Sequence, residues 1–149
     1  MPIIRGKYYE RRQPLVKVRL SNAIPHYVGE ELSIGPAAEI ACDVWALVDT
    51  GATHSVIDRQ IQVELMLLQQ GSKPVLFPNM GTIEFHPTYT CGLHFFDHYS
   101  DGAKVHEWKD WLEVLSFDLT ERTFKAVIGM DVLQAAKLSV DQGLPIIEF

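Results

Sequence analysis

The chain has 149 residues, of which 47% are hydrophobic and 21% charged, and its formal net charge is −6. A domain of this length buries most of the surface of its unfolded chain without a disulfide or metal, so we expect a single domain over 1–149. The acidic balance disfavours nucleic acid as a partner, because no Lys/Arg cluster is longer than Arg11-Arg12.

The two cysteines, Cys42 and Cys91, form no Cys-x-x-Cys pair. We expect both to be small, reduced residues rather than a disulfide. No signal-peptide pattern opens the chain, and no apolar run reaches the roughly 20 residues of a membrane-spanning helix. The sequence therefore predicts a cytoplasmic protein with no membrane partner.

The first half of the chain alternates strand signals with turn residues. Residues 14–20 alternate apolar and charged side chains, which predicts a half-buried strand. The segment 21–40 is punctuated by proline and glycine and should be loop with short strand pieces. Residues 41–48 form a second strand signal, nearly continuous in apolar character toward its end. Apolar residues at helical spacing then predict a short helix over about 58–68.

The segment 74–96 reads as two or three strands with a hairpin turn at 78–81. The next segment, 102–119, fits either a helix or a strand over its first half. Its second half, 111–119, alternates and favours a strand.

The last part of the chain predicts a strand that ends at Ile128, a turn at Gly129, and a helix that carries Val132, Leu133 and Ala136. Residues 144–149 are a final short strand. The whole pattern indicates a mainly β protein with two short helices.

The stretch "VDTGAT" places a carboxylate, Asp49, directly after an apolar strand. The strand would hold the acid on a rigid element, the Thr50 hydroxyl would hydrogen-bond under the turn, and Gly51 would let the chain turn tightly. Alternatively, Asp49 simply caps a strand-end turn. The tripeptide alone is weak, because it arises by chance in roughly a few per cent of chains this long.

Two further segments follow in order: "PNMGTIEF" at the predicted hairpin, and "VIGMDVL", an apolar pair and a glycine before a helix. With "VDTGAT", this ordered set resembles the retropepsin-like aspartic proteases, which include retroviral proteases, the protease-like domain of DNA-damage-inducible ubiquitin shuttles and small bacterial relatives. The resemblance covers about 44–141. It implies a mainly β, retropepsin-like acid-protease fold: a closed β-barrel-like sheet with a flap hairpin and one or two short helices.

The resemblance also implies an aspartic endopeptidase that hydrolyses peptide bonds with water held between two carboxylates, without a metal or cofactor. The chain has one Asp-Thr-Gly, and Asp131 is no second copy because it lies in a helix turn. A working dyad therefore needs Asp49 from each of two chains, which predicts a homodimer acting on a peptide or protein substrate. The terminal segments "MPII" and "LPIIEF" are expected to interleave between subunits; pairing within one chain is the alternative.

Roles for individual residues follow from the same resemblance. Thr50 would brace the two loops across the dimer axis, and Met80 and Gly81 would form the flap tip. Ala52 lacks the hydroxyl that favours the charged carboxylate in some relatives, so the pH optimum should lie nearer neutral than in a stomach-type enzyme. The implied catalytic set is Asp49, Thr50 and Gly51, and the implied substrate contacts are Ala52, Thr53, His54, Met80, Gly81 and Ile128.

Two other functions remain open. The chain would be an inactive dimerisation or peptide-binding module if it kept the fold and lost turnover. A metal-dependent hydrolase using His94 and His98 is disfavoured, because their stretch is aromatic and turn-rich rather than helical. An Asp49→Asn substitution distinguishes the first alternative, and a chelator the second.

Overall fold

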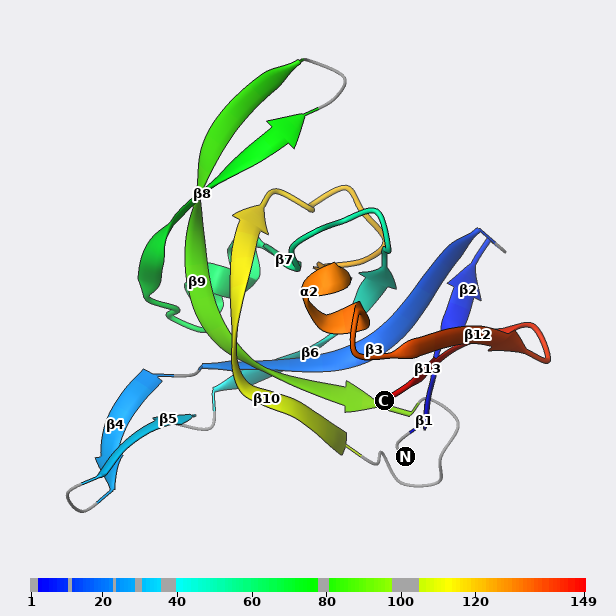
Figure 1. Ribbon diagram of the computed structural model, residues 1–149, viewed down its shortest axis with the longest axis horizontal. Coiled ribbons are helices and arrows are strands. Elements are labelled where there is room, and N and C mark those ends of the chain that lie inside the picture. The colour runs from blue at the N-terminus through cyan, green and yellow to red at the C-terminus, as the bar shows by residue number, and fades with distance from the viewer. Residues whose placement is uncertain are drawn as a thin grey trace.

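The computed structural model is built almost entirely of strands (Figure 1). It describes residues 3–10, 12–22, 24–28, 31–35, 40–77, 81–97 and 105–149. None of the helices in these ranges has the length and apolar character needed to cross a membrane. The elements in chain order are β1 Ile3–Arg5, β2 Lys7–Tyr9, β3 Gln13–Asn22, β4 Ile24–Val28, β5 Glu31–Gly35, β6 Ala41–Val48, β7 Val56–Asp58, α1 Arg59–Glu64, β8 Gln69–Phe77, β9 Thr82–Phe96, β10 Val105–Phe117, β11 Ala126–Ile128, α2 Met130–Leu133, β12 Lys137–Asp141 and β13 Leu144–Glu148.

The largest sheet closes into a ring because β3 has partners on both sides. It pairs antiparallel with β6 along one edge and with β9 along the other. The order β6-β11-β7-β10-β9 completes the ring, with β11 parallel to β6 and β10 parallel to β7. This arrangement confirms the predicted closed, β-barrel-like sheet.

The alternation on β3 fills the interior of this ring. Val16 and Val18 are fully buried and Leu20 is 1% exposed, whereas Lys17 and Arg19 between them are only half-buried. Side chains from β9, β10 and α2 complete the core. Burying an aliphatic side chain of this size contributes about 1.5–3 kcal/mol, so the alternating pattern both selects the strand and sets which face turns inward. The strand predicted at 14–20 is confirmed.

Two hairpins extend outward from the ring (Figure 1). In the β8–β9 hairpin the last described pair is Phe77 with Thr82, and Gly81 has a positive φ of 62° that favours glycine. The predicted pair of flap strands is therefore confirmed, while residues 78–80 lie outside the described residues. The β4–β5 hairpin provides the short strand pieces expected within 21–40.

The two ends of the chain form a small sheet of their own, in the order β1-β13-β12. Arg5, the last residue of β1, is anchored to the ring by Asp97: its guanidinium Nη2 lies 2.6 Å from Asp97 Oδ2, and its amide donates to Oδ1 at 3.1 Å. Both edges of β13 are occupied within the chain, one by β1 and the other by β12. The terminal strands follow the alternative of pairing with each other, which leaves β12 as the open edge.

Both helices are shorter than the sequence pattern suggested. The helix expected over 58–68 ends at Glu64, because Met66 adopts a positive φ of 52° and the chain turns so that Leu65 and Leu67 enter the core. The next strand, β8, begins at Gln69, one residue beyond the predicted end of the helix. The helix after Gly129 has a single turn, and Ala136 lies beyond its end.

Two strand assignments also differ from expectation. The segment left open between helix and strand is strand from Val105 to Phe117, with register irregularities against β9 between Glu107 and Leu112 that break its alternation. β12 was missed, because all five of its residues are exposed and so give no apolar periodicity.

The two cysteines are free thiols, as predicted. Cys91 is buried in the core and Cys42 is half-buried. Burial raises the pKa of Cys42 to about 11 and that of Cys91 to about 12. Both thiols are therefore protonated and unreactive at neutral pH.

Candidate active site

Asp49 lies at the point where β6 leaves the ring. The three residues before it pair in parallel with β11, and the Asp49 amide donates to the Ile128 carbonyl oxygen at 3.0 Å. The backbone is therefore held by the sheet up to the acid itself. The Asp49 side chain is half-buried, at the boundary between the core and solvent.

The loop after Asp49 is organised by its own carboxylate. The Gly51 amide donates to Asp49 Oδ1 at 2.8 Å, and the Ala52 amide donates to the Asp49 carbonyl oxygen at 3.3 Å. A Cβ at position 51 would lie 3.1 Å from the same Oδ1, a tight contact that the carboxylate would have to relieve by shifting a few tenths of an ångström. The hydrogen bond from the Gly51 amide fixes the direction of one carboxylate oxygen.

Gly129 passes directly beneath this loop. A Cβ on Gly129 would lie 2.8 Å from the carbonyl oxygens of Ala52 and His54, so no side chain fits there. The next residue, Met130, donates its amide to the Ala52 carbonyl oxygen at 2.7 Å. The segment "VIGMDVL" thus supports the acid-bearing loop from below through close backbone contact.

Ser55 and Asp131 form a second support that the sequence did not reveal. The Ser55 amide and hydroxyl donate to the two Asp131 carboxylate oxygens at 2.9 and 2.8 Å, and the Gly129 amide donates to Ser55 Oγ at 3.1 Å. Ser55 is 2% exposed. Asp131 therefore holds the far end of the loop and is no partner for Asp49 in acid–base chemistry.

A cleft of about 360 Å³ opens beside the loop, between it and the β8 arm. Its walls are mostly apolar and come from the loop, β7, β8 and β10. The lining residues are Gly51, Ala52, Thr53, His54, Val56, Pro74, Val75, Leu76, Leu115 and Phe117. Four of the residues predicted for the site, Gly51 to His54, thus lie together along one cleft.

A chain of polar contacts crosses from the loop to the neighbouring strands. The Lys73 ammonium lies 2.7 Å from Glu113 Oε1 and 3.4 Å from His54 Nε2. An ammonium can only donate, so Nε2 accepts, and His54 Nδ1 donates to Thr53 Oγ1 at 3.0 Å. Lys73 and Glu113 were not predicted, because contacts across 19 or more residues leave no local sequence signal.

The remaining predicted residues are placed differently. Thr50 is exposed and lines a separate groove against the β12–β13 hairpin. Ile128 is 2% exposed, so its side chain packs in the core and its carbonyl positions Asp49. Gly81 lies at the exposed tip of the flap strands, and Met80 lies outside the described residues.

Metal ligands do not gather in the part of the chain that the structure describes. Within those ranges, no group of three or more His, Cys, Asp or Glu side chains has the arrangement to hold a metal ion. His98, considered for that role from the sequence, lies outside them. The described site therefore consists of a carboxylate, a braced loop and an apolar cleft.

Comparison with known proteins finds likeness in structure but not in sequence. No protein-family model matches the sequence, and no curated protein matches it. Among solved structures, the chain is similar to a retropepsin-like aspartic protease from Rickettsia conorii, with a TM-score of 0.53, 13% identity, and 98% of each chain covered. The fold is that of a retropepsin-like protease.

Identity this low establishes the retropepsin-like fold alone, so any activity has to be argued from the residues of this chain. The likeness spans almost the whole chain. It thus extends beyond residues 44–141, which carry the resemblance in sequence.

Proposed function

We propose that the protein is an aspartic endopeptidase that hydrolyses peptide bonds as a homodimer, with one Asp49 from each chain. The observation that carries the proposal is the way Asp49 is held. It follows a strand of the ring, its carboxylate is oriented by the Gly51 amide, and its loop is supported from below at Gly129. A turn cap needs no such support from a segment 80 positions away in the sequence.

The chemistry needs a second carboxylate. Two acids held close together share a proton, because like charges raise the apparent pKa of the pair. The ionised acid takes a proton from a water molecule, whose oxygen attacks the carbonyl carbon, while the protonated acid donates to the carbonyl oxygen. The carbon–nitrogen bond then breaks and the leaving amine takes a proton, so no covalent enzyme intermediate forms.

The second acid has to come from another copy of the chain. Asp131 is committed to Ser55 on the far side of the loop. Thr50, next to Asp49, is exposed in the single chain. A two-fold axis beside Thr50 would bring two identical acids together with the smallest number of chains.

The cleft favours an extended peptide as substrate. Its walls are mostly apolar, and one of them is the β8 strand of a hairpin arm with exposed apolar side chains: Leu76, Ile83 and Phe85 are 61%, 64% and 72% exposed. A peptide laid between loop and arm would cover these side chains and gain strand-like backbone hydrogen bonds.

The test compares wild type with Asp49→Asn on a mixed peptide library, with the products identified by mass spectrometry. We expect wild type to cleave and Asp49→Asn to lose at least about a hundredfold in rate, while it stays folded. Asp118→Asn, at an exposed acid outside the site, is the matched control and should retain activity. A statine-type peptide should inhibit the wild type, and a chelator should not.

Three results would contradict the proposal. Cleavage of no library peptide by the wild type would favour a peptide-binding module. Equal rates for wild type and Asp49→Asn would remove the acid from the mechanism. Loss of activity to a chelator would point to a metal-dependent hydrolase.

A further inference from the structure

The cleft beside the acid-bearing loop ends at a line of polar groups that come from three separate elements. Thr53 and His54 belong to the loop and line the cleft. Lys73 belongs to β8, 19 positions after His54, and Glu113 belongs to β10. The Lys73 ammonium lies 2.7 Å from Glu113 Oε1 and 3.4 Å from His54 Nε2. These contacts also determine which atoms carry hydrogen.

Lys73 determines the tautomer of His54. An ammonium has three hydrogens and no lone pair, so the ring nitrogen that faces it, Nε2, has to be the one without hydrogen. A neutral imidazole then carries its hydrogen on Nδ1, because the hydrogen bond made by one ring nitrogen sets the protonation of the other. His54 Nδ1 lies 3.0 Å from Thr53 Oγ1 and therefore donates to it.

The same bonds determine what the Thr53 hydroxyl offers to a ligand. A hydroxyl has one hydrogen and two lone pairs. One lone pair accepts from His54 Nδ1, and the hydroxyl hydrogen has no acceptor among the residues that the structure describes. Because Thr53 is exposed and lines the cleft, this hydrogen is available to a group inside the cleft. With the other tautomer of His54, the hydroxyl would donate to Nδ1 and offer only lone pairs.

The charges around the cleft favour a neutral group as the acceptor. Glu113 lies within ion-pair distance of Lys73, so the two charges offset each other at this end of the cleft. The described residues that line the cleft include no acid, lysine or arginine, and its walls are mostly apolar. A carboxylate that enters such a cleft loses more hydration free energy than an amide does, and it finds no unpaired cation there. A lysine is disfavoured too, because its ammonium can only donate.

We propose that Lys73 is a positioning residue for substrate selection: by fixing the tautomer of His54, it makes Thr53 Oγ1 a hydrogen-bond donor to the substrate. This inference rests on the proposed function and names a feature of the substrate. The substrate side chain that enters the cleft has an apolar stem that ends in a neutral oxygen acceptor, as in glutamine. Its stem packs against apolar walls such as Val56 and Val75, and its oxygen accepts from Thr53.

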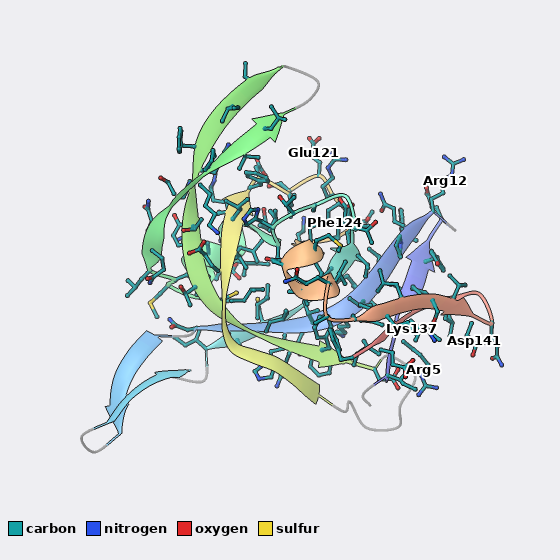
Figure 2. All side chains as sticks on the ribbon, in the orientation of Figure 1. Arg5, Arg12, Glu121, Phe124, Lys137 and Asp141 are labelled. Carbon is teal, nitrogen blue, oxygen red and sulfur yellow. The ribbon has the colours of Figure 1, made fainter. Side chains whose placement is uncertain are left out.

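The tautomer can be measured without a substrate. Two-bond ¹H–¹⁵N correlation spectra, recorded at about pH 8 where histidine is ordinarily neutral, distinguish a ring nitrogen that carries hydrogen from one that does not. We expect wild-type His54 to be protonated on Nδ1, and Lys73→Met to shift it toward the Nε2 form. Lys73→Arg keeps a group that only donates and should keep the Nδ1 form. Lys137→Met removes an exposed lysine on β12, far from the β8 arm in Figure 2, and should leave the spectrum of His54 unchanged.

Two peptide libraries test the selection itself. They are identical except that one position carries either methionine or methionine sulfoxide, which keeps the stem and adds one neutral oxygen that only accepts. At one distance from the scissile bond, the sulfoxide should lower KM roughly fivefold, the effect of one neutral hydrogen bond, with kcat within about twofold. Thr53→Ser keeps the hydroxyl and should keep this preference. Thr53→Val and Lys73→Met should each reduce it below about twofold.

Peptide capture separates this inference from the proposed function. Both libraries are passed over immobilised Asp49→Asn, which retains the cleft, and the captured peptides are identified by mass spectrometry. If the wild type cleaves nothing but Asp49→Asn captures sulfoxide peptides preferentially, and adding Thr53→Val abolishes that preference, the selection stands and the proposed function fails. If neither cleavage nor capture occurs, both fail.

Three results would overturn the inference even if cleavage requires Asp49. One is a wild type whose His54 carries its hydrogen on Nε2. Another is equal KM for the methionine and sulfoxide members of every peptide pair. The third is a Lys73→Met variant that keeps both the Nδ1 form and the preference, because Lys73 would then have no part in the selection.

Discussion

The close passage of Gly129 under the acid-bearing loop makes Gly129→Ala the sharpest test of how the site is held. The added Cβ would meet three backbone atoms of Ala52 and His54 at 2.8 Å, closer than the 3.0 Å that real Cβ atoms keep. Relief to a contact of 3.4 Å needs a displacement of about 0.6 Å. None of the three atoms can rotate away as a side chain would, so the loop itself has to move.

We expect this overpacking to cost about 1–3 kcal/mol in the free energy of unfolding. For a chain of this size that is a loss of roughly 3–10 °C in melting temperature, measured by circular dichroism. The displacement reaches Asp49 through the loop, so peptide cleavage should fall about tenfold or more.

Gly71→Ala is the matched control for the same change. Its Cβ would lie 3.7 Å from Thr88 Oγ1, an ordinary contact, and its unfolding free energy should stay within about 0.5 kcal/mol of wild type. If Gly129→Ala melts with the wild type and Gly71→Ala, the loop does not depend on close backbone support and this account of the site is wrong.

Three other perturbations probe the supports and the charges. Asp131→Ala leaves the Ser55 amide and hydroxyl without their acceptors and should lower the free energy of unfolding by about 2–3 kcal/mol, seen as a lower urea midpoint; an unchanged midpoint would count against the brace. The hydrogen bond from Arg19 lowers the pKa of Asp43, so this carboxylate adds stability above its ordinary pKa of about 4, which is lost as the pH falls through the lowered value. Asp43→Asn should therefore be less stable than wild type at about pH 6, and their urea midpoints should converge toward about pH 2; a constant difference would contradict this. Arg5→Ala should lower the free energy of unfolding more than Arg19→Ala in the same assay. The partner of Arg5, Asp97, is 8% exposed, whereas the partner of Arg19, Asp43, is 36% exposed; equal losses would refute the anchoring of β1.

Elements whose two faces differ were predictable from the sequence. The strand at 14–20 alternates because one face fills the ring, and β13 alternates in the same way against the core. β12 has no buried face and left no pattern. The helix expected to reach residue 68 ends earlier because Leu65 and Leu67 pack in the core. The free energy gained by burying these two side chains outweighs the weak helix propensity of residues 65–68.

The candidate site divides along the same line. The turn after Asp49 is local, because its hydrogen bond joins residues two positions apart, so its geometry follows from the order Asp-Thr-Gly. The Ser55–Asp131 brace joins residues 76 positions apart, so the local sequence around either residue does not indicate the contact. The family resemblance implied Ile128 as a substrate contact; in the structure its side chain packs inside the ring.

The sequence by itself determined the local parts of the candidate site: one acid after a strand, a glycine that lets its loop turn, and a second glycine ahead of a short helix. These depend on the conformational freedom of single residues and on the period of apolar side chains, which are local properties. Tertiary structure alone decided which strands share an edge, because pairing joins segments from opposite ends of the chain. The closure of the ring through β3, the anchoring of β1 by Asp97 and the open edge at β12 all follow from that pairing.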